Sequence, residues 1–266
     1  MTKGEYLMIY EYLKYKIDKQ VAVVTIDRPP VNSLDADVFR ELKDIFDELE
    51  DDPEVSAIVL TGNGEKAFVA GADIKEMMNQ NLVGINQANK KARATYTTVE
   101  SVSKPVIAAI NGVALGGGFE LALACDVRIS SEKAKFSFPE VGLAIIPGGG
   151  GTQRLQKIVG QGITKELIYF GDMVPAERAL ELQLVNKVVP QEEVLSEAVK
   201  WAGKLAEKPA VALSMAKMAI NEGSNTDLET GLSLEMNCFS NAFSSEDGKE
   251  GLHAFAEKRK PNYVGR

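Results

Sequence analysis

The hydrophobic positions in the first part of the chain predict strands and helices in alternation. Residues 12–27 predict a β-hairpin, because two runs of apolar and β-branched residues flank a short polar turn. Over residues 34–50 the apolar positions recur every three or four residues, which is typical of an amphipathic helix. Asn32 or Ser33 is a suitable residue to cap its start, and the helix is expected to end before Pro53.

Two continuously apolar runs follow, "VSAIVLTG" at residues 55–62 and "KPVIAAING" at residues 104–112. Such runs are typical of buried parallel strands, and each ends in glycine, where the chain must turn. Residues 74 to about 101, between them, predict a helix. The repeated order of strand, turn and helix indicates an α/β core with one face of the sheet covered by helices.

The second half of the chain begins with short elements and ends with helices. Strands are expected in "DVRISS" (126–131) and "AKFSF" (134–138), and short helices in "GGTQRLQKIVG" (150–160), "TKELIYFG" (164–171) and "PAERALELQ" (175–183). From residue 191 to 258 the pattern is almost wholly helical, in segments separated by Pro, Gly, Asn and Ser. We therefore expect an α/β core over residues 12–190. A helical region over residues 191–266 should pack on that core or on a neighbouring subunit.

Composition and charge narrow the class of protein. The 266 residues are 45% hydrophobic and 26% charged, which is ordinary for a soluble globular protein. No run approaches the roughly 18 apolar residues of a membrane span, and the N-terminus is too polar for a signal peptide, so a cytoplasmic protein without a membrane partner is expected. The net charge of −8 disfavours binding to nucleic acid.

The residues that bind metals or form disulfides are few. Cys125 and Cys238 are the two cysteines, and we interpret them as free core thiols in a reducing compartment. The single histidine, His253, has no recognisable metal-ligand spacing to either cysteine, so no metal site is expected.

Glycine-rich loops are the strongest chemical signal in the chain. Three of them, at residues 68–76, 112–122 and 138–155, combine glycine with a potential reactive group. Glycine allows a positive φ and lets a ligand approach the peptide N–H groups, while a following helix directs its positive end at the same place. This geometry suits an anion.

Common anion-binding and nucleophilic motifs do not fit these loops. None has the Gly-Lys-Ser/Thr ending of a P-loop, and the register of a dinucleotide-binding turn is not evident. A serine hydrolase is disfavoured because no G-x-S-x-G elbow is present and there is one histidine. For any one loop, a structural interpretation stays open, in which the glycines serve packing. Glu120, in an apolar segment, would then be a core carboxylate satisfied by hydrogen bonds.

Taken together, the loops resemble those of a known family. The segments "AGADIKE", "NGVALGGGFELALACD" and "FPEVGLAIIPGGGGTQRL", followed by "FAEKRKPNY", resemble in order and separation those of the crotonase (enoyl-CoA hydratase/isomerase) family, and within it the short-chain enoyl-CoA hydratases. The resemblance extends from about residue 12 to the end. It implies a crotonase-like ββα spiral core over residues 12–190 and a helical trimerisation region over residues 191–266. The implied assembly is a homotrimer or a homohexamer made of two trimers.

The resemblance also implies the residues that carry the chemistry. It places an oxyanion hole at the backbone N–H groups of Ala72 and Gly117, which would stabilise the enolate of an acyl-CoA thioester. Glu120 and Glu140 align with two acids that act on a water molecule, and facing carboxylates repel, which raises the pKa of one. By resemblance Glu140 protonates the α-carbon and Glu120 activates the water. Gly148 matches a family position whose backbone helps to orient that water.

For the CoA moiety, the resemblance implies a site shared between subunits. Its adenine and pantetheine are expected near Val31, Leu34, Ala70, Asp73 and Ile74. Phe255 and Lys258 would reach the nucleotide end, often from a neighbouring subunit, where a lysine suits a phosphate. Without the resemblance, Lys258 is as well explained as a solvated helix end, and Asp73 as the N-cap of a helix that starts at Ile74.

The presence of both acids favours one reaction of the family. We expect hydration of a trans-2-enoyl-CoA to a 3-hydroxyacyl-CoA, or the reverse dehydration, in fatty-acid β-oxidation or butyrate-type metabolism. No cofactor is implied, because CoA is part of the substrate. The alternatives are an enoyl-CoA isomerase and a non-catalytic acyl-CoA-binding subunit. Phe119, which precedes Glu120, is expected to narrow the acyl pocket.

Overall fold

The computed structural model describes residues 10–265. Residues 1–9, on which part of the signal-peptide argument rests, and Arg266 lie outside the described residues. Over the described range, no helix combines the length and the apolar character needed to cross a membrane.

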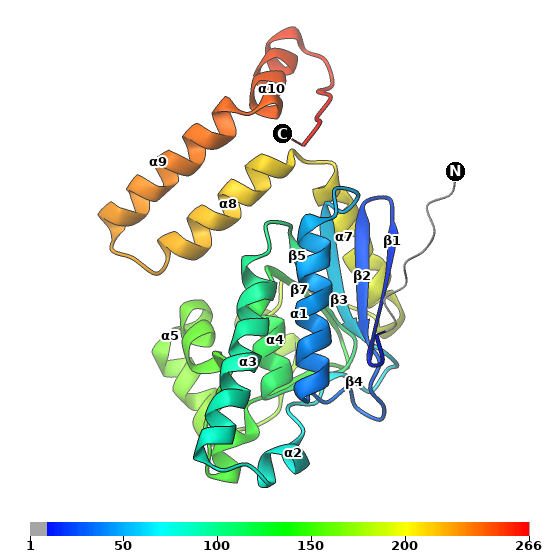
Figure 1. Ribbon diagram of the computed structural model, residues 1–266, viewed down its shortest axis with the longest axis vertical. Helices are drawn as coiled ribbons and strands as arrows, with labels where there is room; N and C mark the ends of the chain where they lie inside the picture. The colour runs from blue at the N-terminus through cyan, green and yellow to red at the C-terminus, as the bar shows by residue number, and fades with distance from the viewer. Residues whose placement is uncertain (1–9, 266) are drawn as a thin grey trace.

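The described chain forms two β-sheets (Figure 1). The larger sheet has six strands in the order β1-β2-β3-β5-β7-β10. These strands are β1 (Leu13–Asp18), β2 (Val21–Ile26), β3 (Ala57–Gly62), β5 (Val106–Ile110), β7 (Val127–Ser131) and β10 (Lys187–Val189). The β1–β2 pair is antiparallel and confirms the predicted hairpin, whereas each later pairing is parallel.

The smaller sheet has four short strands in the order β4-β6-β8-β9. They are β4 (Ala67–Val69), β6 (Val113–Leu115), β8 (Lys135–Ser137) and β9 (Val174–Pro175). The chain repeatedly passes from a strand of the large sheet to a strand of the small sheet and then into a helix. This β-β-α repeat confirms the predicted α/β spiral core. The loops that carry the predicted site residues lie where the chain leaves the small sheet.

Helices cover both faces of the large sheet, not one as the sequence pattern indicated. On one face, Ile58 and Leu60 of β3 belong to the core that contains α1 (Ala36–Asp51), α3 (Leu82–Ser101) and α4 (Gly117–Ala124). On the other face, Ala57 and Val59 pack with α7 (Val194–Ala206). Burial on both faces explains why β3 and β5 are continuously apolar.

Two helix boundaries differ from the prediction. Asp35, rather than Asn32 or Ser33, is the N-cap of α1, since its carboxylate accepts a hydrogen bond from Val38 N at 2.9 Å. Asn32 is instead buried, and its amide donates to Ala67 O at 3.0 Å. The helix expected over residues 74–101 is two helices, α2 (Ile74–Met78) and α3.

The C-terminal helices extend away from the core. After α5 (Gly151–Phe170), which bends at Gly160, and the short α6 (Ala176–Glu181), α7 completes the sheet packing. Three further helices, α8 (Ala210–Gly223), α9 (Leu228–Ser244) and α10 (Glu246–Glu257), project beyond it (Figure 1). An ion pair of 2.8 Å between Lys217 Nζ and Asp126 Oδ2 holds α8 to the core. The division of the chain at residue 190 stays a prediction.

Candidate active site

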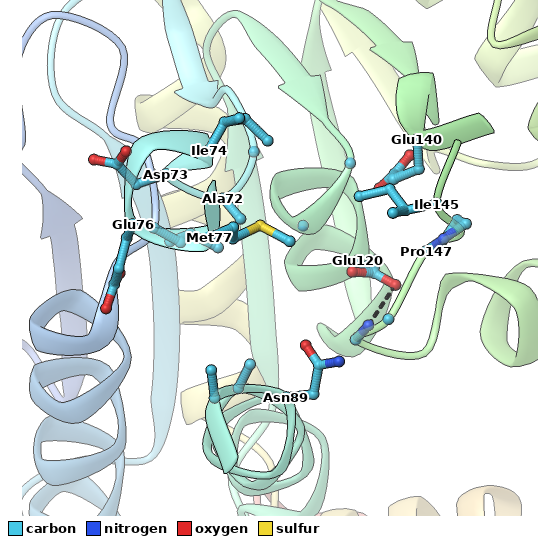
Figure 2. A pocket seen from close by; sticks show the side chains of 18 of the residues that line it. Ala72, Asp73, Ile74, Glu76, Met77, Asn89, Glu120, Glu140, Ile145 and Pro147 are labelled. Atoms are coloured by element: carbon cyan, nitrogen blue, oxygen red, sulfur yellow. Dashed lines mark hydrogen bonds between the residues drawn. The ribbon is translucent and has the colours of Figure 1, made fainter. Parts of the chain in front are cut away.

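A cavity of about 820 Å³ lies between α3, the N-terminus of α4 and the loops that follow β4 and β8. Its walls include nine of the predicted site residues: Leu34, Ala70, Ala72, Asp73, Ile74, Gly117, Glu120, Glu140 and Gly148. Figure 2 shows Ala72 and Met77 on one side of the cavity, with Glu120 and Glu140 on the other. The fold thus gathers segments that are far apart in the sequence around one space.

Two backbone N–H groups face this cavity without a partner. Leu34 forms a parallel bridge with Ala72, in which Leu34 N donates to Gly71 O and Leu34 O accepts from Asp73 N, so Ala72 N is left unused. Gly117 is the first residue of α4, where an N–H has no acceptor within the helix. No acceptor for either group is present within residues 10–265. Both are therefore available to a ligand oxygen.

The two donors lie close together. A Cβ placed on Gly117 would lie 3.7 Å from Ala72 N and 3.0 Å from the hydroxyl oxygen of Tyr96. A side chain at residue 117 would therefore crowd the Tyr96 hydroxyl and contact the Ala72 N–H group. The positive end of the α4 dipole adds to the attraction for a negative oxygen here.

Glu120 is buried in the first turn of α4 and is held by peptide donors. Its Oε1 accepts hydrogen bonds from Gly149 N and Gly151 N, both at 2.8 Å. Burial raises the pKa of Glu120, while these N–H groups and the Arg154 guanidinium oppose the shift. Glu120 is therefore a buried carboxylate with hydrogen-bond donors, and its surroundings also shift its pKa.

Glu140 has a different environment, on the short 3-10 helix η1 (Pro139–Leu143). Its Oε2 is buried, and no group of the described chain forms a hydrogen bond with it. Burial, with a smaller contribution from the charge of Glu120, raises the pKa of Glu140 to about 7. Glu140 is therefore the acid of the pair that more readily holds a proton.

Arg154, which the sequence argument missed, fixes the loop that holds Glu120. Its Nη1 donates to Gly149 O at 2.9 Å, and its Nε and Nη2 form a bidentate pair with Glu100 at 3.1 and 2.7 Å. The Gly149 residue is thus bound at its carbonyl by Arg154 and at its N–H by Glu120. Arg154 lies close to the N-terminus of α5, where the helix dipole disfavours a cation, and this position is a weak sequence signal that Arg154 has an acidic partner.

Asn89 on α3 is a second residue that the sequence argument missed. Its side chain lines the cavity and points inward (Figure 2). The Asn89 amide lies 3.6 to 3.8 Å from the place that a Cβ on Gly148 would occupy. Asn89 therefore adds a polar group beside the predicted water-orienting residue, and no motif in the sequence marks it.

Three of the predicted CoA-binding residues do not line the cavity. Val31 is adjacent to it through the backbone, where Val31 O accepts from Ala70 N at 3.1 Å. Phe255, which is 86% exposed, and Lys258 lie on α10 and at its C-cap, away from the cavity in this chain (Figure 1). Their participation from a neighbouring subunit stays a prediction.

Two further expectations concern Asp73 and Phe119. Asp73 is the N-cap of α2, as the alternative interpretation held, and it also pairs with Arg28 Nη2 at 3.0 Å, which lowers the pKa of Asp73. The expectation for Phe119 is wrong. Its ring is 1% exposed and stacks on Phe138 with centroids 4.8 Å apart, so it fills the core and does not narrow the cavity.

The described residues contain no cluster of His, Cys, Asp and Glu side chains that could hold a metal ion. The cavity brings together two carboxyl groups in unlike environments and two peptide N–H donors that have no partner in the described chain. This combination defines an enzyme that moves protons next to a carbonyl group whose oxygen becomes negatively charged.

Comparison with known proteins identifies the family. The family model for enoyl-CoA hydratase/isomerase matches residues 16–266, and the chain belongs to this family. It is 44% identical over 97% of its length to the whole of crotonyl-CoA hydratase from Syntrophomonas wolfei. It is 47% identical over 91% of its length to short-chain-enoyl-CoA hydratase from Clostridium acetobutylicum, covering 93% of that protein.

Solved structures show the same fold. The crystal structure of enoyl-CoA hydratase from Bacillus anthracis matches with a TM-score of 0.92 and 42% identity, over 96% of this chain and 100% of that one. An enoyl-CoA hydratase structure from Geobacillus kaustophilus matches with a TM-score of 0.92 and 40% identity, over 97% and 99% of the two chains. The ββα architecture predicted from the motifs is confirmed.

The raised pKa of Glu140 predicts a pH dependence of stability. Because the folded state holds this proton up to about pH 7, it binds more protons than the unfolded state from the ordinary carboxyl pKa upward. The contribution of Glu140 to stability is therefore lost as the pH rises toward 7. At each pH we take the melting temperature of Glu140→Gln minus that of the unsubstituted protein. We expect this difference to be more positive at pH 8 than at pH 5. Exposed Glu65→Gln is the control, and equal shifts at both pH values would contradict the assignment.

Proposed function

We propose that this protein is an enoyl-CoA hydratase, which adds water to a trans-2-enoyl-CoA to give a 3-hydroxyacyl-CoA and catalyses the reverse dehydration. The observation that carries this proposal is the presence of two carboxyl groups, Glu120 and Glu140, in one cavity with two free peptide donors. The relatives named crotonyl-CoA hydratase and short-chain-enoyl-CoA hydratase support both the reaction and a short acyl chain.

The thioester carbonyl oxygen is expected to bind between the N–H groups of Ala72 and Gly117. Attack of water at C3 moves electrons onto this oxygen and forms an enolate. Fixed donors stabilise that charge more than they stabilise the neutral carbonyl of the substrate, and this difference lowers the barrier. The unused state of both N–H groups supports this role.

The two acids have complementary tasks. Glu120, held by Gly149 N and Gly151 N, is the better anion of the pair and accepts a proton from the water whose oxygen bonds to C3. Glu140, with a pKa of about 7, holds a proton that it gives to C2 as the enolate collapses. The Gly148 backbone and the Asn89 amide lie where that water can be oriented.

We place the CoA moiety along Val31, Leu34, Ala70, Asp73 and Ile74, with Phe255 and Lys258 supplied by a neighbouring subunit. Assembly as a homotrimer or a homohexamer is supported by an exposed apolar stripe on α9. Leu232, Met236, Phe239 and Phe243 follow helical spacing and are 53, 63, 67 and 55% exposed. The absence of a cofactor and the cytoplasmic location stay predictions.

Crotonyl-CoA tests the reaction directly. Hydration removes the conjugated double bond, so we expect the ultraviolet absorbance of the enoyl thioester to fall when the protein is added. A 3-enoyl-CoA separates the alternatives, because an isomerase would convert it to the 2-enoyl product. Binding of acyl-CoA with no turnover of any enoyl chain length would instead support a non-catalytic subunit and overturn the proposal.

Removing either acid should abolish most of the activity. We expect Glu120→Gln and Glu140→Gln each to lower kcat for crotonyl-CoA hydration at least about a hundredfold, because positioned acids and bases contribute about 10² to 10⁴ in rate. Glutamine keeps the shape of the side chain, so circular dichroism should show an intact fold. Near-normal kcat in either variant would remove that residue from its role.

Arg154→Met should disturb Glu120 without touching substrate. The variant keeps an apolar stem but loses the hydrogen bond to Gly149 O and the positive charge that lowers the pKa of Glu120. We expect kcat to fall about 10- to 100-fold, since small misplacement of a catalytic group is costly. The acidic limb of the kcat/KM pH profile should move to higher pH. Arg178→Met, which breaks an exposed pair with Glu181, is the control, and equal behaviour of the two variants would contradict the role.

A further inference from the structure

Tyr96 lies between the two glycine loops of the site, and the mechanism above gives it no task. It belongs to α3, lines the cavity and is 1% exposed. Its ring packs edge-on against Phe39, with centroids 5.5 Å apart and planes at 89°. Phe39 therefore fixes the ring on one side, and the opposite side of Tyr96 contacts the loops that contain Gly117 and Gly149.

The hydroxyl of Tyr96 binds the residue that supplies one enolate donor. Tyr96 Oη donates to Gly117 O at 3.0 Å. Gly117 has no side chain, so its backbone is freer to rotate than that of other residues. A hydrogen bond at its carbonyl restrains the orientation of the residue whose N–H faces the cavity.

The ring of Tyr96 also contacts the residue that holds Glu120. A Cβ built on Gly149 would lie 2.1 Å from Tyr96 Cε2, so the ring rests directly on the Gly149 backbone. Gly149 N donates to Glu120 Oε1 at 2.8 Å. One side chain thus touches both the enolate-binding residue and the residue that orients the base.

The hydroxyl remains a neutral donor in this setting. Burial, with a smaller contribution from the negative charge of Glu120, raises the pKa of Tyr96 well above its ordinary value. Its proton is therefore available to Gly117 O across the range in which the carboxyl groups titrate.

We propose that Tyr96 is a positioning residue. Through its hydroxyl bond to Gly117 O and its ring contact with Gly149, it fixes the position of the Gly117 N–H relative to the Glu120 carboxylate. The inference rests on the proposed hydratase function. It goes beyond that function because Tyr96 acts through the two glycines and not on the reacting atoms.

Tyr96→Phe isolates the hydroxyl. Phenylalanine keeps the ring contacts with Phe39 and Gly149, so the change removes one hydrogen bond and leaves the packing. Tyr10→Phe is a control for the loss of a tyrosine hydroxyl bond away from the site, because the half-buried Tyr10 donates to Glu48 Oε1 at 2.8 Å and does not line the cavity.

The kinetic result separates positioning from a merely structural role. For Tyr96→Phe we expect kcat for crotonyl-CoA hydration to fall about tenfold or more, as misalignment of an enolate donor should cost part of the 10²- to 10³-fold that such a donor contributes. KM should change less than about threefold, and the pH profile should keep its shape. Tyr10→Phe should match the unsubstituted protein. A kcat within twofold of that protein would overturn the role of Tyr96 and leave the hydratase function standing.

A binding measurement tests the same inference without turnover. Acetoacetyl-CoA ionises to an enolate with its own ultraviolet absorbance, whereas butyryl-CoA has no comparable anion. If Tyr96 positions the Gly117 donor, Tyr96→Phe should weaken enolate binding at least about fivefold and leave butyryl-CoA affinity unchanged. Equal weakening of both ligands, or of neither, would overturn the proposal. If the unsubstituted protein fails to hydrate crotonyl-CoA, the hydratase function fails by itself, and the enolate measurement still decides the role of Tyr96.

Discussion

The burial of Glu120 is the constraint on which the rest of the site depends. An ionised carboxylate in an apolar helix is very costly unless donors surround it, and here the donors are Gly149 N and Gly151 N. To supply them, the loop must lie directly against α4. A Cβ on Gly149 would approach Tyr96 Cε2 to 2.1 Å and Glu120 Oε2 to 2.6 Å. Glycine at positions 149 and 151 of "PGGGGTQRL" is therefore a packing requirement of the carboxylate.

The hydrogen bonds from the glycine loop to Glu120 also make the two acids differ in their affinity for a proton. Burial raises the pKa of both acids. For Glu120 the peptide donors and the nearby Arg154 oppose this shift, whereas Glu140 has one buried oxygen without a partner in the described chain and a pKa of about 7. Two identical side chains thus differ in their affinity for a proton because of their surroundings, as the proposed roles of base and acid require. The hydrogen bonds from the loop to Glu120 favour Glu140 as the acid that holds the proton.

The long elements were predictable because their periodicity is a local property. The hairpin, the strands β3 and β5 and the C-terminal helices follow directly from apolar spacing. Strands as short as β4, β6 and β9 contain two or three residues, too few to show a period, and they were missed. The covering of the second sheet face by α7 was also missed, since a continuously apolar strand does not say which helix packs on it.

The sequence by itself determined the family. Its motifs also identified five candidate site residues that line one cavity: Ala72, Gly117, Glu120, Glu140 and Gly148. Tertiary structure alone decided that Tyr96 touches Gly117 and Gly149, and that Arg154 pairs with Glu100 across 54 positions. It also decided that Phe255 and Lys258 lie away from the cavity of their own chain. The physical reason is that motif residues are constrained by local backbone geometry. Supporting contacts form between elements that folding brings together, and they leave no regular spacing in the sequence.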